Sequence, residues 1–246
     1  MADSARFLRR QFLMGLGAWS VARAADRPVL PVLVAEQADL DFVRPLLKLV
    51  AEGGGFDWQF VIVPWARLLV LAMQGDALAW GLSRSPERDA VLNFSEQVFN
   101  TRVWLVTPAG QPLSAPTVAG LDGRKLCKRR GFTLGAALDL AEREQRFQVI
   151  DSDLGYDGLL RMLAAGRCDG LLMTYRSGDP AVVEQRIAMM APPAGRFVVQ
   201  RPPLSEGGIY FAAARKRPEL QAQLQRVNAG LRAQAQAIQA VVASNA

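Results

Sequence analysis

Apolar runs alternate with amphipathic stretches along most of the chain, and this alternation predicts strands that alternate with helices. The first block contains apolar runs at Val29–Ala35, Phe56–Val63, Ala77–Leu82 and Val98–Val106. Between them, residues 40–52 and 65–74 repeat apolar positions at helical spacing, and glycines end both segments. Such alternation predicts an α/β fold with mostly parallel sheets flanked by helices.

A second block of the same kind follows the turn-rich segment TPAGQPLSAP. It predicts strands at Arg124–Lys128, Phe147–Ile150, Asp169–Thr174 and Arg196–Gln200, with helices at Thr133–Arg146, Tyr156–Ala165 and Pro180–Met190. Residues 202–208 are expected to break the pattern before a returning strand at Ile209–Ala214. A single helix is expected over Pro218–Val242, packed on the first lobe through one apolar stripe.

This organisation predicts two lobes with a ligand cleft between them, because pockets favour lobe interfaces and the carboxyl ends of strands. We expect lobe 1 to comprise residues 25–108 and 202–246, and lobe 2 to comprise residues 109–201. The N-terminal residues 1–24 are typical of an export signal, with a basic start, a short apolar run and an Ala-x-Ala site. Arg9 and Arg10 before Gln-Phe-Leu resemble a twin-arginine signal, with an ordinary Sec signal as the alternative. Either route predicts a periplasmic protein without stable membrane insertion.

Composition narrows the function classes. The chain of 246 residues has no histidine, which excludes imidazole-based catalysis and histidine-ligated zinc. Two cysteines, Cys127 and Cys168, cannot form a four-cysteine metal site, so we expect no metal and no cofactor. They could form a disulfide, but two buried free thiols are the favoured state at this point.

The positive charge is partly a property of the N-terminus. Residues 1–24 hold four of the 29 cations and one of the 23 anions, so the net charge of +6 falls to +3 for the remainder. A cationic cluster, Arg124, Lys125, Lys128, Arg129 and Arg130, lacks the interleaved aromatic residues of single-strand binders. We therefore expect a solvated edge and no nucleic-acid partner, with Arg130 as a lesser candidate for the cleft.

One segment carries the chemistry. Ser85-Pro86-Glu87 is typical of a helix start, with an N-cap serine and a proline in the first helical position. Arg88 comes next, where a cation faces the positive end of the helix dipole. Because that placement is unfavourable unless an anion offsets it, and a guanidinium fork suits a carboxylate, we predict that Arg88 binds a carboxylate.

Three motifs resemble the periplasmic solute-binding proteins of family 3, the polar amino-acid type with a type 2 bilobed fold. They are GLSRSPERDAVLNFSE at Gly81–Glu96, the stretch from Leu121-Asp122-Gly123 to Gly131-Phe132-Thr133, and LAAGRCDGLL at Leu163–Leu172. The resemblance covers most of the chain after residue 24. It implies a monomeric binding protein, not an enzyme, that delivers an amino acid or related solute to an ABC-type transporter.

The resemblance also assigns residue roles. It implies that Arg88 grips the ligand carboxylate, that Ser83 and Thr133 add hydroxyl contacts, and that Trp65 forms an aromatic wall. Trp80 and Trp104 are expected in the core or at the lobe interface. Thr174 stands where the family usually places an aspartate for the ligand ammonium, so Thr174 is expected in the site as a hydroxyl only.

This departure leaves alternatives open. The ligand is either a carboxylate without a demanding ammonium group, or an amine that Glu36 or Tyr175 recognises. A lyase or dehydratase on the same scaffold would need an acid such as Glu36 or Asp153 in the cleft. An orphan sensor that signals without transport is the third hypothesis.

Overall fold

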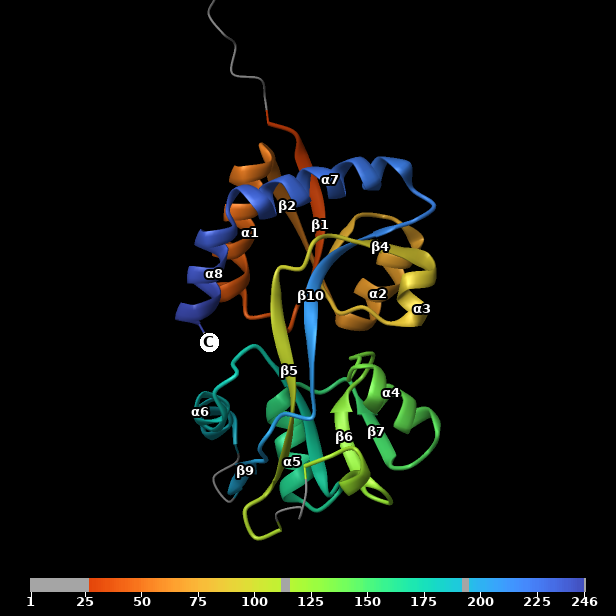
Figure 1. Ribbon diagram of the computed structural model, residues 1–246, viewed down its shortest axis with the longest axis vertical. Helices are drawn as coiled ribbons and strands as arrows, with labels where there is room; N and C mark the ends of the chain where they lie inside the picture. The colour runs from red at the N-terminus through yellow and green to blue at the C-terminus, as the bar shows by residue number, and fades with distance from the viewer. Residues whose placement is uncertain (1–26, 112–115, 192–194, 246) are drawn as a thin grey trace, which may run out of the picture.

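The computed structural model describes residues 27–111, 116–191 and 195–245. The predicted export signal at residues 1–24 lies outside these ranges. The chain adopts an α/β fold in which one curled, mixed sheet is flanked by helices, and the elements gather in two lobes (Figure 1). The α/β class and the two-lobed architecture are confirmed.

Lobe 1 is the upper group in Figure 1. Its strands are β1 (Val29–Ala35), β2 (Asp57–Val63), β3 (Leu78–Leu82) and β4 (Leu92–Phe94), and its helices are α1 (Leu40–Gly54), α2 (Trp65–Gln74), α3 (Pro86–Val91), α7 (Pro218–Ala233) and α8 (Ala235–Ser244).

Lobe 2 is the lower group (Figure 1). It holds β6 (Lys125–Arg129), β7 (Gln148–Ser152), β8 (Gly170–Tyr175), β9 (Phe197–Val199), α4 (Ala136–Arg143), α5 (Tyr156–Ala164), α6 (Pro180–Met190) and a short 3-10 turn at Ala119–Leu121. Two long strands, β5 (Phe99–Pro108) and β10 (Ser205–Ala214), run side by side through both groups. The lobe boundaries predicted from sequence stay predictions.

The sheet is mixed, which corrects the expectation of mostly parallel pairing. Its strand order is β2-β1-β3-β10-β5-β8-β6-β7. The outer pairs β1/β2, β1/β3, β6/β7 and β6/β8 are parallel. The central strands β5 and β10 pair antiparallel with each other, and β10 also with β3 and β5 with β8. These two strands connect the lobes in opposite directions, so they introduce antiparallel pairing that the alternation pattern cannot show.

The first helix illustrates how the sequence builds an element. Asp39 caps α1 by accepting a hydrogen bond from the Phe42 backbone N–H at 3.4 Å, and Gly55 ends it in the left-handed conformation, with φ of 69°. Of the predicted apolar stripe, Val43, Leu46, Leu47 and Val50 are buried and Leu40 is partly buried. Phe42, which the prediction did not include, is buried with them.

Many predicted bounds differ from the structure by one or two residues, and three predicted elements were wrong by more than that. Strand β10 begins at Ser205, so the glycine pair Gly207-Gly208 lies within a strand that pairs with β5. Helix α4 begins at Ala136 because Gly135, with φ of 92°, keeps the preceding residues in a loop. The C-terminal segment forms two helices that meet at Gln234, although both pack against α1, as the predicted docking on lobe 1 requires.

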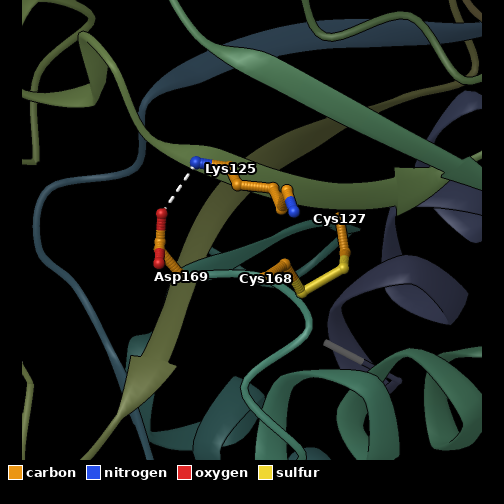
Figure 2. The surroundings of a disulfide bond; sticks show 4 residues. All are labelled: Lys125, Cys127, Cys168 and Asp169. Atoms are coloured by element: carbon orange, nitrogen blue, oxygen red, sulfur yellow. Dashed lines mark hydrogen bonds between the residues drawn. A yellow bond between two sulfur atoms is a disulfide. The ribbon is translucent and has the colours of Figure 1, made fainter.

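Cys127 and Cys168 form a disulfide, so the expectation of two free thiols was wrong (Figure 2). Cys127 lies in β6, and Cys168 lies two residues before the start of β8, which pairs with β6. That pairing brings the two Cα atoms to 5.9 Å, within the usual range for a disulfide. Next to it, the Lys125 backbone N–H donates to the Asp169 carboxylate at 2.8 Å, which joins the same two segments (Figure 2).

Candidate ligand-binding site

Helix α3 begins as the sequence predicts. The Ser85 hydroxyl oxygen accepts a hydrogen bond from the Arg88 backbone N–H at 3.3 Å, and Pro86 occupies the first turn. The helix follows β3 after a short connection, so its first turn lies near the carboxyl end of that strand. This arrangement places the Arg88 side chain at the boundary between the lobes.

The Arg88 guanidinium links the two lobes. It donates to the Ser83 carbonyl at 2.8 Å and to the Gly131 carbonyl at 2.6 Å, and Gly131 belongs to lobe 2. Burial lowers the pKa of Arg88, while Asp139 and Glu87 raise it. An arginine starts from so high a pKa that it keeps its charge at neutral pH. In this closed arrangement, backbone carbonyl oxygens directly contact the cation.

All five residues that the sequence singles out line a single cavity of about 30 Å³, which we call the central pocket. Lobe 1 contributes Trp65, Ser83 and Arg88, and lobe 2 contributes Thr133 and Thr174. Sequence reasoning missed the other lining residues, which are Gly81, Phe132 and Ile209. Their ligand roles stay predictions, but the tertiary structure does bring the five together from both lobes.

Phe132 was the most informative omission. It lies between Gly131 and Thr133, in the variable position of the Gly-x-Thr motif, so the motif itself gave no signal for it. Its ring meets the Trp65 ring edge to face, with centroids 5.0 Å apart. An ideal Cβ on Gly131 would lie 3.0 Å from Trp65 Nε1, so this glycine permits the close approach of the lobes.

Ion pairs close the cleft at two further places. Arg143 of lobe 2 lies 3.1 Å from Glu87 of lobe 1. Arg176, just after β8, lies 3.4 Å from Asp39, and its guanidinium stands 4.3 Å from the centroid of the Phe42 ring. These contacts and the small central pocket describe a closed cleft.

The backbone of Thr174 is fixed by Tyr156 at the start of α5. The Tyr156 hydroxyl accepts from the Thr174 N–H at 3.0 Å and donates to the Thr174 carbonyl at 3.1 Å. Burial raises the pKa of Tyr156, and nearby Arg129 opposes that rise. The neutral phenol therefore holds the end of β8 and leaves the Thr174 side chain on the central pocket.

Three larger hollows share three or more lining residues with the central pocket, and the third of them, of about 420 Å³, shares Arg88, Phe132 and Thr133. The first, the aromatic hollow, measures about 190 Å³ and is lined by Phe42, Val43, Trp80, Gly81, Phe99, Thr101, Phe132, Thr174, Tyr175, Arg176 and Ile209. The second, the polar hollow, measures about 220 Å³ and shares Ser83, Thr133 and Thr174 with the central pocket. Trp80 packs in the lobe 1 core and Trp104 in the lobe 2 core, as expected.

The acids proposed for an amine or for catalysis lie elsewhere. Glu36 and Asp153 line another hollow together with Arg129 and Arg130, and this hollow shares Trp65 with the central pocket. Asp153 pairs there with Arg130 at 3.1 Å, which places Arg130 outside the central pocket. Within the described ranges, no cluster of histidine, cysteine or acidic residues is arranged to hold a metal ion. No helix in the described part of the chain is long and apolar enough to cross a membrane.

No known protein family matches this sequence, and no curated protein sequence does. Solved structures do match. A histidine kinase sensor domain with similarity to periplasmic binding proteins is 20% identical, with a TM-score of 0.71 over 89% of this chain and 96% of that chain.

Two other solved structures give the same result. A mutant of ArgBP from T. maritima is 18% identical, with a TM-score of 0.68 over 88% of this chain and 94% of that one. The VFT2 domain of BvgS from Bordetella pertussis is 20% identical, with a TM-score of 0.65 over 89% of this chain and 93% of that chain. At such identities the similarity shows the fold: the chain has the fold of periplasmic binding proteins.

Proposed function

We propose that this protein is a periplasmic solute-binding protein of the polar amino-acid type, whose lobes close around a small carboxylate-bearing solute. The observation that carries the proposal is the convergence of Arg88, Ser83, Trp65, Thr133 and Thr174, from both lobes, on the central pocket. Residues 1–24 would direct export by the twin-arginine route. Residues 25–108 with 202–246, and residues 109–201, would move as the two bodies, with β5 and β10 as the hinge.

The closed pocket has room for little more than a water molecule, so the lobes must separate for a solute to enter. Separation breaks the hydrogen bond from Arg88 to Gly131 and the contact between Trp65 and Phe132. A carboxylate then replaces the Gly131 carbonyl as the partner of Arg88. A charged acceptor forms a stronger hydrogen bond with a guanidinium than a neutral carbonyl does, so binding favours the carboxylate.

Thr133 and Thr174 would close on the solute from lobe 2, while Ser83 and the wall of Trp65 hold it from lobe 1. Two hypotheses concern the partner that recognises the closed, ligand-bound form. A membrane transporter, as in amino-acid import, is the first. A signalling partner is the second, favoured by the similarity to a histidine kinase sensor domain. The lyase hypothesis is the least supported, because Glu36 and Asp153 line a different hollow.

Calorimetry on the purified protein tests this function against a panel of amino acids and small organic carboxylates. We expect at least one carboxylate to bind, and Arg88→Ala to weaken it by roughly 100-fold, as loss of a buried charge-assisted partner does. Arg88→Lys should recover only part of that affinity, because an ammonium lacks the fork.

Arg161→Ala is the matched control. Arg161 pairs with Asp157 on the surface of α5, away from the pockets described above, so its removal should leave affinity unchanged. A tight ligand that binds the Arg88→Ala variant as well as the wild type would refute the proposed function.

A further inference from the structure

We propose that the bound solute is an organic carboxylate that has no ammonium group, with an apolar, ring-like body. This inference rests on the proposed function and names the class of ligand for the same pocket. It follows from three observations: the charges at the central pocket, its unpartnered hydrogen-bond groups, and the chemistry of the adjoining aromatic hollow.

The central pocket has one charged lining residue, the cation Arg88, among the residues that the structure describes. Thr174 offers a neutral hydroxyl where an ammonium would need a carboxylate. An ammonium group buried near Arg88 would lose hydration and face a like charge, without an anion to offset either cost. A carboxylate ligand without an ammonium group would neutralise the single positive charge of Arg88 and leave no charge in the pocket without a partner.

The acids that line the adjoining hollows already have partners: Glu87 pairs with Arg143 at 3.1 Å, and Glu142 pairs with Lys128 at 2.9 Å. Glu206 lines the adjoining polar hollow and pairs with Arg102 at 2.8 Å. Asp139 lies beyond Arg88 and accepts a hydrogen bond from the Leu134 backbone N–H at 2.8 Å. To recruit any of these acids for an ammonium would break an existing contact, so the charge balance of the cleft disfavours an α-amino acid.

The hydrogen-bond groups of the pocket also favour an acceptor-rich ligand. Trp65 Nε1 is buried and has no partner, and an indole nitrogen can only donate. Within the described part of the chain, the Ser83, Thr133 and Thr174 hydroxyls form no hydrogen bond with protein atoms. Carboxylate or keto oxygens would satisfy Trp65 Nε1, which an ammonium cannot do, and the three hydroxyls can donate to the same oxygens.

The aromatic hollow identifies the body of the ligand. It shares Gly81, Phe132, Thr174 and Ile209 with the central pocket, so a molecule held by Arg88 can extend directly into it. Aromatic rings line it, and Arg176 is its charged lining residue, engaged with Asp39. Its volume of about 190 Å³ exceeds the roughly 150 Å³ of an apolar protein cavity that holds benzene.

Matched pairs of ligands test the inference by calorimetry on the wild-type protein. L-Phenylalanine is compared with 3-phenylpropanoate, and L-leucine with 4-methylpentanoate, since the members of each pair differ only by the ammonium group. We expect each amine-free carboxylate to bind at least tenfold more tightly than its amino acid. Equal or tighter binding of the amino acids would overturn the inference.

Two substitutions locate the cause at one position. Thr174→Asp adds the missing carboxylate, and Thr174→Asn is its uncharged control of the same shape. We expect Thr174→Asp to improve L-phenylalanine binding at least tenfold over Thr174→Asn, whereas Thr174→Asn keeps the wild-type preference. The same preference in both variants would contradict the role of Thr174. The wild-type ligand pairs decide the question even if Thr174→Asp does not fold.

The two levels of the argument fail in different ways. If the amino acids bind more tightly and Arg88→Ala abolishes their binding, the proposed function stands and this inference is wrong. If no member of the pairs or of the wider carboxylate panel binds, the proposed function fails and this inference fails with it.

Discussion

Lobe 1 and lobe 2 are stabilised by different means. In lobe 1, α7 crosses α1 so closely that a Cβ on Gly230 would lie 2.0 Å from the Val50 carbonyl oxygen, and a large apolar core lies beneath the two helices. Lobe 2 has smaller core clusters, and the Cys127–Cys168 disulfide joins two of its segments. A smaller core contributes less hydrophobic free energy, and a covalent link compensates by restricting the unfolded chain.

The same division extends to the central pocket. Lobe 1 supplies its cation, Arg88, whereas lobe 2 supplies the hydroxyls of Thr133 and Thr174 and the ring of Phe132. We therefore expect substitutions that destabilise lobe 1 to affect the capture of a charged ligand, and substitutions that destabilise lobe 2 to affect the closure of the cleft. The following predictions test that comparison, from the largest expected effect to the smallest.

Loss of the disulfide should have the largest effect on stability. The bond closes a loop with a sequence separation of 41, so Cys127→Ala with Cys168→Ala should lower the free energy of unfolding by about 3–4 kcal/mol. Hydrogen exchange should locate the lost protection in lobe 2. A reductant should destabilise the wild type and leave the double variant unchanged; equal sensitivity of both would contradict the assignment.

Gly230→Ala should destabilise lobe 1 instead. Alanine improves helix propensity by about 1 kcal/mol, but its Cβ would collide with backbone atoms of α1, which cannot rotate away. We expect a net loss of about 2–3 kcal/mol in chemical unfolding. Gly110→Ala, where a Cβ meets nothing within 4 Å, is the control and should be neutral. Hydrogen exchange of Gly230→Ala should show lost amide protection in lobe 1, and a loss in lobe 2 instead would refute the comparison.

Tyr156→Phe should have an intermediate effect, about 1–2 kcal/mol, because it leaves the Thr174 N–H and carbonyl without their hydroxyl partner. The pKa of Tyr156 is raised, so the contribution of the neutral phenol is fully present below the ordinary value of 10.0 and is lost as the pH rises through the raised pKa. Wild type and Tyr156→Phe should therefore differ in their free energy of unfolding at neutral pH, and this difference should disappear at strongly alkaline pH. A constant difference would contradict this role.

The contact of Arg143 with Glu87 should have the smallest effect, because both side chains are exposed. The pKa of Glu87 is lowered, first by a backbone N–H and the Ser85 hydroxyl and then by Arg143. Its contribution is therefore present above the ordinary value of 4.5 and is lost as the pH falls through the lowered pKa. Melting temperatures of wild type and Glu87→Gln should differ slightly at pH 7, and the difference should shrink as the pH falls below 4.5.

Local patterns predicted most elements, because local spacing decides which face of a helix or strand is buried. Helices Trp65–Gln74 and Pro180–Met190 and strand Val29–Ala35 have the expected bounds. The wrong predictions concern longer-range effects. The strand from Ser205 contains a glycine pair that sequence reasoning interprets as a break, but pairing with β5 overrides that local preference.

The sequence by itself determined that a cation would follow the cap of α3, that the Thr133 hydroxyl would follow one strand of lobe 2 and that the Thr174 hydroxyl would lie near the end of another, because helix starts and strand ends are local signals. Only the tertiary structure decided that these groups share one pocket, that Phe132 closes it, and that Cys127 meets Cys168. Each of these facts depends on the pairing of segments far apart in the chain, and distances across such pairs are set by the whole sheet rather than by neighbouring residues.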